Sequence, residues 1–361
     1  MHRLNNHPDT LRVGDCDADR RRHDNPALGR SSACGRRRAA VMALGLPIAL
    51  MLGLGAASPG QAQERYPNRP IRIVVPFAAG GIADIYARVL GKSMGEQLGT
   101  TFVIENKPGA GTVIGTEAVV RSKPDGYTML LASAPLATNP GLMAKLPYDT
   151  LKDLTPVVQL SSQGFVISVH EKTPYKTFAD LVSAARQNDI PYASPGNGTL
   201  MHLVGQLLNL EYGTRFVHVP YRGSAPALQD ATSGQIGMII DPLSTSLPGI
   251  QQGKLRPLAV THPDRLPALQ AVPTLRELGY PKGEAQAFSG FLVPAGVPPE
   301  MVAVLNKAAN QAMLQPDVRE TIVVKLQSPL IGGTPEAYAQ FLRAELARWV
   351  PLIKRVGIKP D

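Results

Sequence analysis

The sequence predicts an α/β fold in which parallel strands alternate with helices. Short β-branched runs such as Ile71–Val75 have the character of buried strands, and glycine turns and apolar-periodic stretches follow them. The order strand, helix, strand, helix, strand from residue 71 to 132 is typical of a parallel sheet. A chain of 361 residues is long enough for about two domains. Ligands of such sheets bind beyond the carboxyl ends of the strands, so the turns after strands are the first places to examine.

Residues 1–62 have the order of an N-terminal extension and a secretory signal peptide. The basic run Arg36–Arg38 precedes the apolar stretch Ala39–Ala57, and the small residues of Ser58–Ala62 follow. The alternative is a retained membrane anchor, because the apolar stretch approaches the length that spans a bilayer. We expect cleavage after Ala62, because proline, glycine and polar residues follow the apolar stretch at once. The sequence does not decide between general secretion and twin-arginine export.

Charge and cysteine content exclude several classes of function. The net charge is +9, but nine arginines and five aspartates lie in residues 1–62, so the balance after them is +5. No basic stripe follows the leader, and we expect no nucleic-acid partner. Cys16 and Cys34 both precede the apolar stretch, so the part after the leader can form no disulfide and no thiolate metal site.

The chain after the leader reads as a series of short strands and helices. We expect strands over 71–75, 101–105, 127–132, 154–158, 165–169, 192–194, 215–219, 236–240, 258–260 and 287–293. We expect helices over 82–98, 113–121, 177–186, 200–209, 299–314, 317–324 and 334–353, and one that starts near 224. Thr177 is the expected N-cap of its helix. The strand over 287–293 is expected to return to the first domain.

The stretch Val74–Arg88 organises this prediction. A buried strand turns at Pro76 and at Gly80–Gly81 and continues as a helix, so unpaired backbone N–H groups and the positive end of the helix dipole meet at one point. Such a point binds a carboxylate or phosphate, or it is an ordinary turn whose glycines allow tight packing. Turns of the same kind recur at Pro195–Thr199 and Pro220–Pro226. Turns from two sheets that converged would build a cleft lined with N–H donors.

A search for catalytic and metal-binding patterns finds none after the leader. There is no nucleophile elbow, no Ser-x-x-Lys and no phosphate-binding P-loop. The four histidines lack metal-ligand spacing, and His202 reads as a helix-face residue rather than a base. Gly109-x-Gly111-x-x-x-Gly115 misses the dinucleotide fingerprint by one position, and we read it as a helix start. We therefore expect no enzyme, no cofactor and no metal.

Three charged residues have local interpretations. Asp84 is expected to brace the first helix through backbone N–H groups. Asp241 follows a strand, where its carboxylate accepts a hydrogen bond from a ligand or stabilises its own turn. Arg222 either pairs with an acidic ligand or faces solvent.

Several segments, in this order, resemble a known family. They are Tyr66–Gly81 with Asp84 and Arg88 beyond it, Glu105–Gly111, Pro124–Thr128, Leu146–Asp149, Ser194–Thr199, His218–Leu228 and Pro294–Gly296. Together they resemble the periplasmic solute-binding proteins of the tripartite tricarboxylate transporter family, also called Bug receptors. The resemblance covers essentially the whole chain after the leader.

The resemblance implies a fold and a function. The fold is the two-domain periplasmic-binding-protein fold (Venus-flytrap, type II-like), with domain one over 66–163 plus 288–361 and domain two over 164–287. The implied function is a monomeric periplasmic receptor that closes around a small carboxylate and presents it to membrane permease subunits. A receptor that serves a signalling partner is the alternative.

The resemblance also implies a ligand site made of backbone amides and small polar side chains. Carried over position by position, it falls on Phe77, Ala78, Gly81, Ile82, Ser133, Ala134, Ser194, Asn197, Gly198, Thr199, Tyr221, Ser224, Ala225 and Asp241. This sequence departs from the family at Ile82 and Ala83, where small or hydroxyl residues are usual, and at Phe288, where Trp is frequent. The domain-one wall should therefore be more apolar than is common. We expect a ligand with an apolar or aromatic portion beside its carboxylate, not a tricarboxylate such as citrate.

Overall fold

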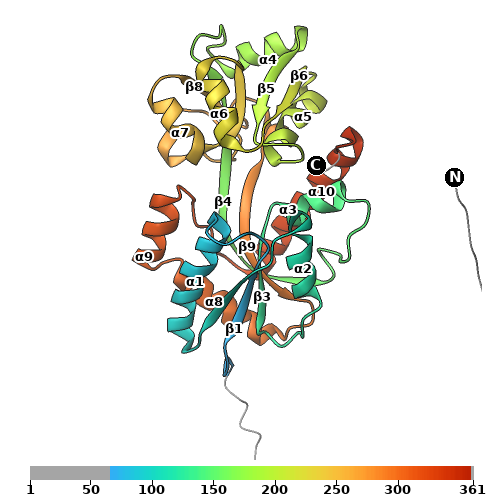
Figure 1. Ribbon diagram of the computed structural model, residues 1–361, viewed down its shortest axis with the longest axis vertical. Helices are drawn as coiled ribbons and strands as arrows, with labels where there is room; N and C mark the ends of the chain where they lie inside the picture. The colour runs from blue at the N-terminus through green and yellow to red at the C-terminus, as the bar shows by residue number, and fades with distance from the viewer. Residues whose placement is uncertain (1–65, 359–361) are drawn as a thin grey trace, which may run out of the picture. The chain divides into compact units, whose positions relative to one another are not determined.

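Two sheets joined by one shared strand form the framework of the protein, described here for residues 66–358 of a computed structural model (Figure 1). The predicted leader and its cleavage site lie outside these residues. The first sheet has the order β2-β1-β3-β9-β4, and the second contains β4, β7, β5 and β6, with β8 paired to β4. The strands are β1 Ile71–Val75, β2 Phe102–Asn106, β3 Thr128–Ser133, β4 Leu154–His170, β5 Ile190–Ser194, β6 Phe216–Pro220, β7 Met238–Pro242, β8 Leu255–Val260 and β9 Gln286–Pro294.

Helices follow most strands, as the sequence predicts. They are α1 Ile82–Leu98, α2 Val113–Val120, α3 Pro135–Leu142, α4 Phe178–Gln187, α5 Leu200–Tyr212, α6 Ser224–Ser233, α7 Leu243–Gln251, α8 Pro299–Ala312, α9 Pro316–Arg319 and α10 Pro335–Val356. Thr177 caps α4, where its side chain accepts from the Asp180 N–H and the Asp180 carboxylate binds the Thr177 N–H in return. Within 66–358, none of the helices is long and apolar enough to cross a membrane.

The sequence prediction was wrong at four places. The predicted strands over 154–158 and 165–169 are one strand, β4, because the polar residues between them pair with β9 instead of forming a loop. Helices α3 and α7 were missed, since each contains a proline, Pro140 or Pro248, where a helix is not expected. The helix predicted over 317–324 is the short α9 followed by a π-helical segment, Glu320–Lys325.

Strand direction makes the carboxyl ends of the two sheets face each other. Strands β1, β2 and β3 are parallel to one another, and both β3 and β4 are antiparallel to β9. Strands β1, β2 and β3 therefore run in the same direction as β4, which leads from the first sheet to the second. Strands β5, β6 and β7 run the opposite way, because β7 is antiparallel to β4 and parallel to β5, which is parallel to β6. The turns that follow both sets of strands thus point toward the junction of the sheets.

The register along β4 and β9 shows how near these turns lie. Ser133 at the end of β3 pairs with Ser289, which pairs with Ser161 of β4. Asp241 at the end of β7 pairs with Val166 of the same strand. Val166 lies five positions beyond Ser161, a distance of about 17 Å along β4. The ends of the two sheets are therefore within reach of opposite ends of one small molecule.

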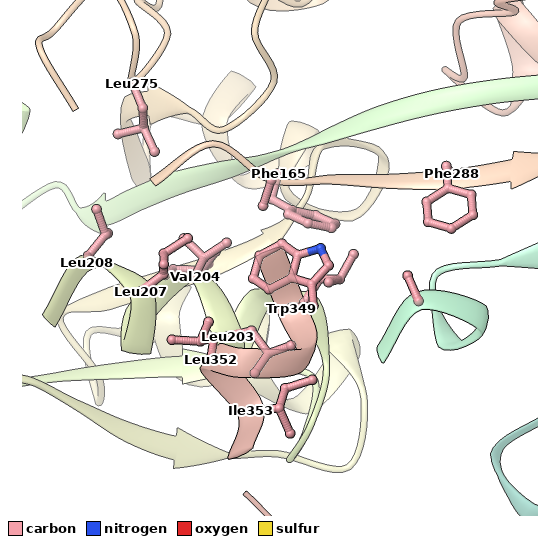
Figure 2. Packing of buried hydrophobic residues seen from close by; sticks show 14 of the residues in the cluster. Phe165, Leu203, Val204, Leu207, Leu208, Leu275, Phe288, Trp349, Leu352 and Ile353 are labelled. Carbon is pink, nitrogen blue, oxygen red and sulfur yellow. The ribbon is translucent and has the colours of Figure 1, made fainter. Parts of the chain in front are cut away.

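Helix α10 ties the second sheet's helix layer to the first sheet. In Figure 2 the fully buried Trp349 lies beside Phe165, with Leu203 and Val204 of α5 nearby. Its indole N–H donates to the buried carboxylate of Glu345 at 2.8 Å. One hydrophobic cluster includes these residues together with Val74 and Leu130 of the first sheet. The strand junction is therefore packed on this side by α10 rather than left open.

Truncating Trp349 tests whether α10 holds this junction. We expect Trp349→Ala to lower the free energy of unfolding by about 3 to 5 kcal/mol, because it opens a cavity in a fully buried cluster. Leu314→Ala is the control, since that side chain is 71% exposed and its loss should change stability little. Denaturant titration of both variants measures the difference. Equal effects would show that α10 contributes no packing of consequence here.

Candidate functional site

The turn from Pro76 to Gly81 is held by the carboxylate of Asp84. Its Oδ2 accepts from the Gly80 N–H and from Arg88 Nε, both at 2.9 Å, and its Oδ1 accepts from Asn106 Nδ2 at 3.0 Å. The Asn106 amide also donates to the Phe77 carbonyl at 3.2 Å. The predicted bracing role of Asp84 is confirmed, and Arg88 and Asn106 are partners that the sequence reasoning did not foresee.

Asp84 is almost fully buried, yet it stays ionised. The hydrogen bond from Arg88 has the largest effect on its carboxyl, and the Gly80 N–H and the Asn106 amide add to it. Against the cost of burial, they lower the pKa of Asp84 from 3.8 to about 2. The turn is thus anchored by a fixed negative charge beneath it, while its upper surface remains exposed.

The exposed surface of this turn is apolar. Ala78, Gly80 and Gly81 are exposed, and Ile82, the first residue of α1, is 51% exposed. Phe77 is half-buried and packs against the core beneath the sheet. No side chain caps α1, so its first N–H groups are not used by a capping side chain.

The turn after β3 lies beside the turn after β1, because these strands are neighbours. Ser133 ends β3 and Ala134 precedes α3, and both are half-buried. Helix α3 also starts without a side-chain cap. The first sheet therefore presents two helix starts toward the second sheet.

In the second sheet, the turn between β5 and α5 is folded tightly on itself. Thr199 Oγ1 donates to the Gly196 carbonyl at 2.8 Å and accepts from the His202 N–H at 3.3 Å, so Thr199 caps α5. Ser194 is fully buried, and its hydroxyl exchanges hydrogen bonds with Gly196 at 3.2 Å. Gly198 has φ +69°, a conformation that favours glycine, and Asn197 is exposed.

Two histidines lie behind this turn, and the sequence reasoning missed their pairing. The rings of His202 on α5 and His218 on β6 stack with centroids 3.7 Å apart and an angle of 9°. His202 Nδ1 accepts from the Gly198 N–H at 3.1 Å, and His218 Nε2 lies 2.6 Å from Ser194 Oγ. The spacing of the two residues gave no signal of this pairing, because one lies on a helix and the other on a strand.

Asp241 is fully buried and bound by three protein hydroxyls. Ser224 Oγ donates to its Oδ1 at 2.6 Å, and Oδ2 accepts from Thr245 and, at 3.2 Å, from Ser246. Burial raises the pKa of Asp241, and the hydroxyl donors partly oppose this. Asp241 was expected either to accept from a ligand or to stabilise its own turn. The contacts of the second kind are present, because the carboxylate joins the start of α6 to the start of α7. Ser224 is half-buried above it.

Of the remaining predicted residues, Ala225 and Arg222 are exposed, whereas Tyr221 contacts α6 through its hydroxyl. Ala225 is exposed in the first turn of α6, whose N-cap Gly223 provides no side-chain cap. Tyr221 directs its hydroxyl to Asp230 at 2.8 Å, so its phenol holds α6 rather than the turn surface. Arg222 is exposed.

A separate small cavity of about 60 Å³ lies beside the strand junction. Residues of β4, of the start of α7 and of the segment after the π-helical Glu320–Lys325 line it, including Gln163, Leu243 and Gln327. It shares Pro242 with the turn after β7. Among residues 66–358, no group of three or more histidine, cysteine or acidic side chains could hold a metal ion.

Replacing Asp84 by asparagine tests the anchor of the first turn. The pKa is lower in the folded protein than in the unfolded chain, so ionised Asp84 stabilises the fold above about pH 4 and this contribution is lost as the pH falls toward 2. We expect Asp84→Asn to lose about 2 kcal/mol of unfolding free energy at neutral pH, measured with urea. The difference from wild type should shrink below about pH 4.

The control is Asp189→Asn, which breaks an exposed ion pair with Arg215 and should change stability little at any pH. A difference between wild type and Asp84→Asn that stays constant down to about pH 3 would contradict the assignment of the lowered pKa.

Comparison with known proteins identifies the family of this chain. The model of the tripartite tricarboxylate transporter family receptor (TctC) matches residues 86–358. Protein BugT of Bordetella pertussis is 36% identical over 309 residues, which cover 84% of this chain and 94% of BugT. The crystal structure of a TctC solute-binding protein from Polaromonas has a TM-score of 0.75 and 29% identity, with 80% and 99% of the two chains covered. An R. palustris protein solved with adipate has a TM-score of 0.66 and 33% identity, with 82% and 100% covered. These structures share the two-domain periplasmic-binding-protein fold predicted here, and the chain belongs to the TctC receptor family.

Proposed function

We propose that this protein is a periplasmic receptor that captures a small carboxylate between its two sheets and presents it to the membrane permease of a tripartite tricarboxylate-type transporter. The observation that carries the proposal is the direction of the strands, which aims uncapped helix starts from both sheets at one junction. Family membership and the adipate held by the R. palustris relative support the carboxylate class.

The chemistry of the turns suits a carboxylate without a cationic side chain. Backbone N–H groups at helix starts carry partial positive charge and donate hydrogen bonds to anions. The residues proposed for the site are Phe77, Ala78, Gly81, Ile82, Ser133, Ala134, Ser194, Asn197, Gly198, Thr199, Tyr221, Ser224, Ala225 and Asp241. Asp241 is the charged residue among them, and its role here is to position Ser224.

Domain closure follows from the position of the site. The proposed hinge crosses β4 and β9 near residues 163 and 287, which separates domain one (66–163 plus 288–361) from domain two (164–287). A ligand touches the turns of both domains only when they approach each other, so binding shifts the protein toward the closed form. Export by the leader of residues 1–62, with cleavage after Ala62, would bring a monomer to the periplasm.

The apolar surface around Ile82 narrows the ligand class. A tricarboxylate would place a charged group against Ala78 and the half-exposed Ile82, where the structure offers it no cationic partner in this turn. A ligand with one carboxylate and an apolar or aromatic portion fits the turns of both domains. A receptor for a signalling partner remains the second candidate, with the same binding step and a different membrane protein.

The ligand class can be tested by calorimetric titration with benzoate, adipate and citrate. We expect benzoate to bind more tightly than citrate, and Ile82→Ser to weaken benzoate binding roughly fivefold, because about 1 kcal/mol of apolar contact is lost. Ile331→Ser is the control, since Ile331 is 50% exposed and lies outside the proposed turns. Tight citrate binding without benzoate binding would contradict this assignment of the ligand class.

Closure can be tested by small-angle X-ray scattering. We expect the radius of gyration to fall when the protein is saturated with a ligand that calorimetry has identified, because the two domains approach each other. An excess of a carboxylate that does not bind is the control. An unchanged scattering curve at saturation would contradict the closing mechanism.

A further inference from the structure

The stacked rings of His202 and His218 contact both ends of the turn between β5 and α5, which belongs to the proposed ligand site. At one end, the Gly198 N–H donates to His202 Nδ1 at 3.1 Å. At the other end, Ser194 Oγ lies 2.6 Å from His218 Nε2. Since the two rings are in contact at 3.7 Å, a change in one ring is felt by the other.

We infer that His202 and His218 are positioning residues that keep the turn between Ser194 and Thr199 in its ligand-binding form while His202 is neutral, so that ligand affinity falls as the pH falls. The inference rests on the proposed function, because it concerns the same turn. It adds a regulation of that site by proton concentration.

The hydrogen bond from Gly198 fixes the protonation state of His202. A neutral imidazole has one acceptor nitrogen, and here Nδ1 accepts, so the proton is on Nε2. Protonation adds a hydrogen to Nδ1, which then faces the Gly198 N–H as a second donor. The bond is lost, and this N–H and the turn that carries it are free to move.

The stacking couples the two titrations. Two imidazolium rings at 3.7 Å repel each other, so the pair takes up its first proton well before its second. Tyr192 of β5 donates to the His202 carbonyl at 2.8 Å and lies 5.2 Å from the His218 ring. Burial raises the pKa of Tyr192, so this hydroxyl stays neutral throughout.

Three charged groups on α5 and on the elements packed against it are held by partners of their own. Glu211 at the end of α5 pairs with Lys282 of η3 (Pro281–Gly283) at 2.5 Å. Arg348 of α10 donates to the Glu284 carbonyl at 2.7 Å. Asp241 of β7 is bound by its three hydroxyls.

The test replaces His202 by asparagine. The asparagine Oδ1 can accept the Gly198 N–H in place of Nδ1, and it does not titrate in this range. The probe is benzoate, whose carboxylate stays ionised between about pH 8 and pH 5.5. We expect wild type to bind it about tenfold more weakly at the lower pH, the effect of one lost hydrogen bond. The affinity of His202→Asn should be the same at both pH values.

A matched control is His170→Asn. His170 is also buried, and its Nδ1 accepts from the Lys172 N–H at 3.3 Å, but it lies at the far end of β4. Its variant should keep the wild-type pH dependence. A second variant, His218→Gln, removes the repelling ring and should raise the pH at which His202 titrates.

A measurement without ligand separates this inference from the proposed function. In nitrogen-15 NMR spectra, the Gly198 amide should shift with a histidine titration in wild type and His170→Asn, and stay constant in His202→Asn. A Gly198 amide that ignores pH in wild type, or that titrates equally in His202→Asn, would overturn the inference. If the amide titrates and benzoate binds at no pH, the positioning role stands and the ligand assignment fails.

Discussion

The pairing of β4 with β9 is the constraint on which the rest of the structure depends. The two strands stay paired from Leu154↔Pro294 to Gly164↔Gln286, through the junction of the sheets. Because β4 continues into the second sheet, its direction sets the direction of every strand beside it. A Cβ atom at Gly164 would lie 2.5 Å from that of His262, so this close approach requires glycine. The Ser162 hydroxyl also bonds the side chains of Gln286 and His262 at this level.

Two of the buried carboxylates, Asp84 and Asp241, have pKa values shifted in opposite directions. Asp84 has a cationic partner, and its pKa falls below the ordinary range. Asp241 has hydroxyl donors, and burial raises its pKa. Both lie under turns rather than on their surface, where each fixes the start of at least one helix. The surface left for a ligand is therefore backbone N–H, small polar groups and the apolar side chain of Ile82.

Much of the fold could be predicted because its signals are local. The run Ile71–Val75 and the helix from Ile82 to Leu98 were found at their observed bounds, and Thr177 was identified as a cap. The continuity of β4 could not be seen, because its polar middle is stabilised by pairing with a strand more than a hundred residues away. Helices α3 and α7 could not be predicted because each contains a proline, which local preference excludes from a helix. Tertiary packing overrides that preference here.

The turns that make up the candidate site could be located from the sequence, but the contacts within them could not. Turns with glycine and hydroxyl residues after strands marked where a ligand should lie, and strand direction brings those turns together. Burial could not be read from the same residues: Ser194 is fully covered, and the Tyr221 hydroxyl turns to Asp230. The stacking of His202 on His218 joins a helix to a strand, and no spacing along the chain encodes that contact.

The central claim is that the junction between the two sheets holds a small carboxylate. Native mass spectrometry of the protein purified without added ligand tests this most directly, because a closed site retains its occupant. We expect a retained molecule that is lost on denaturation and proves to be a carboxylate with an apolar portion. A retained molecule without a carboxylate, such as a sugar or a cationic amine, would contradict it.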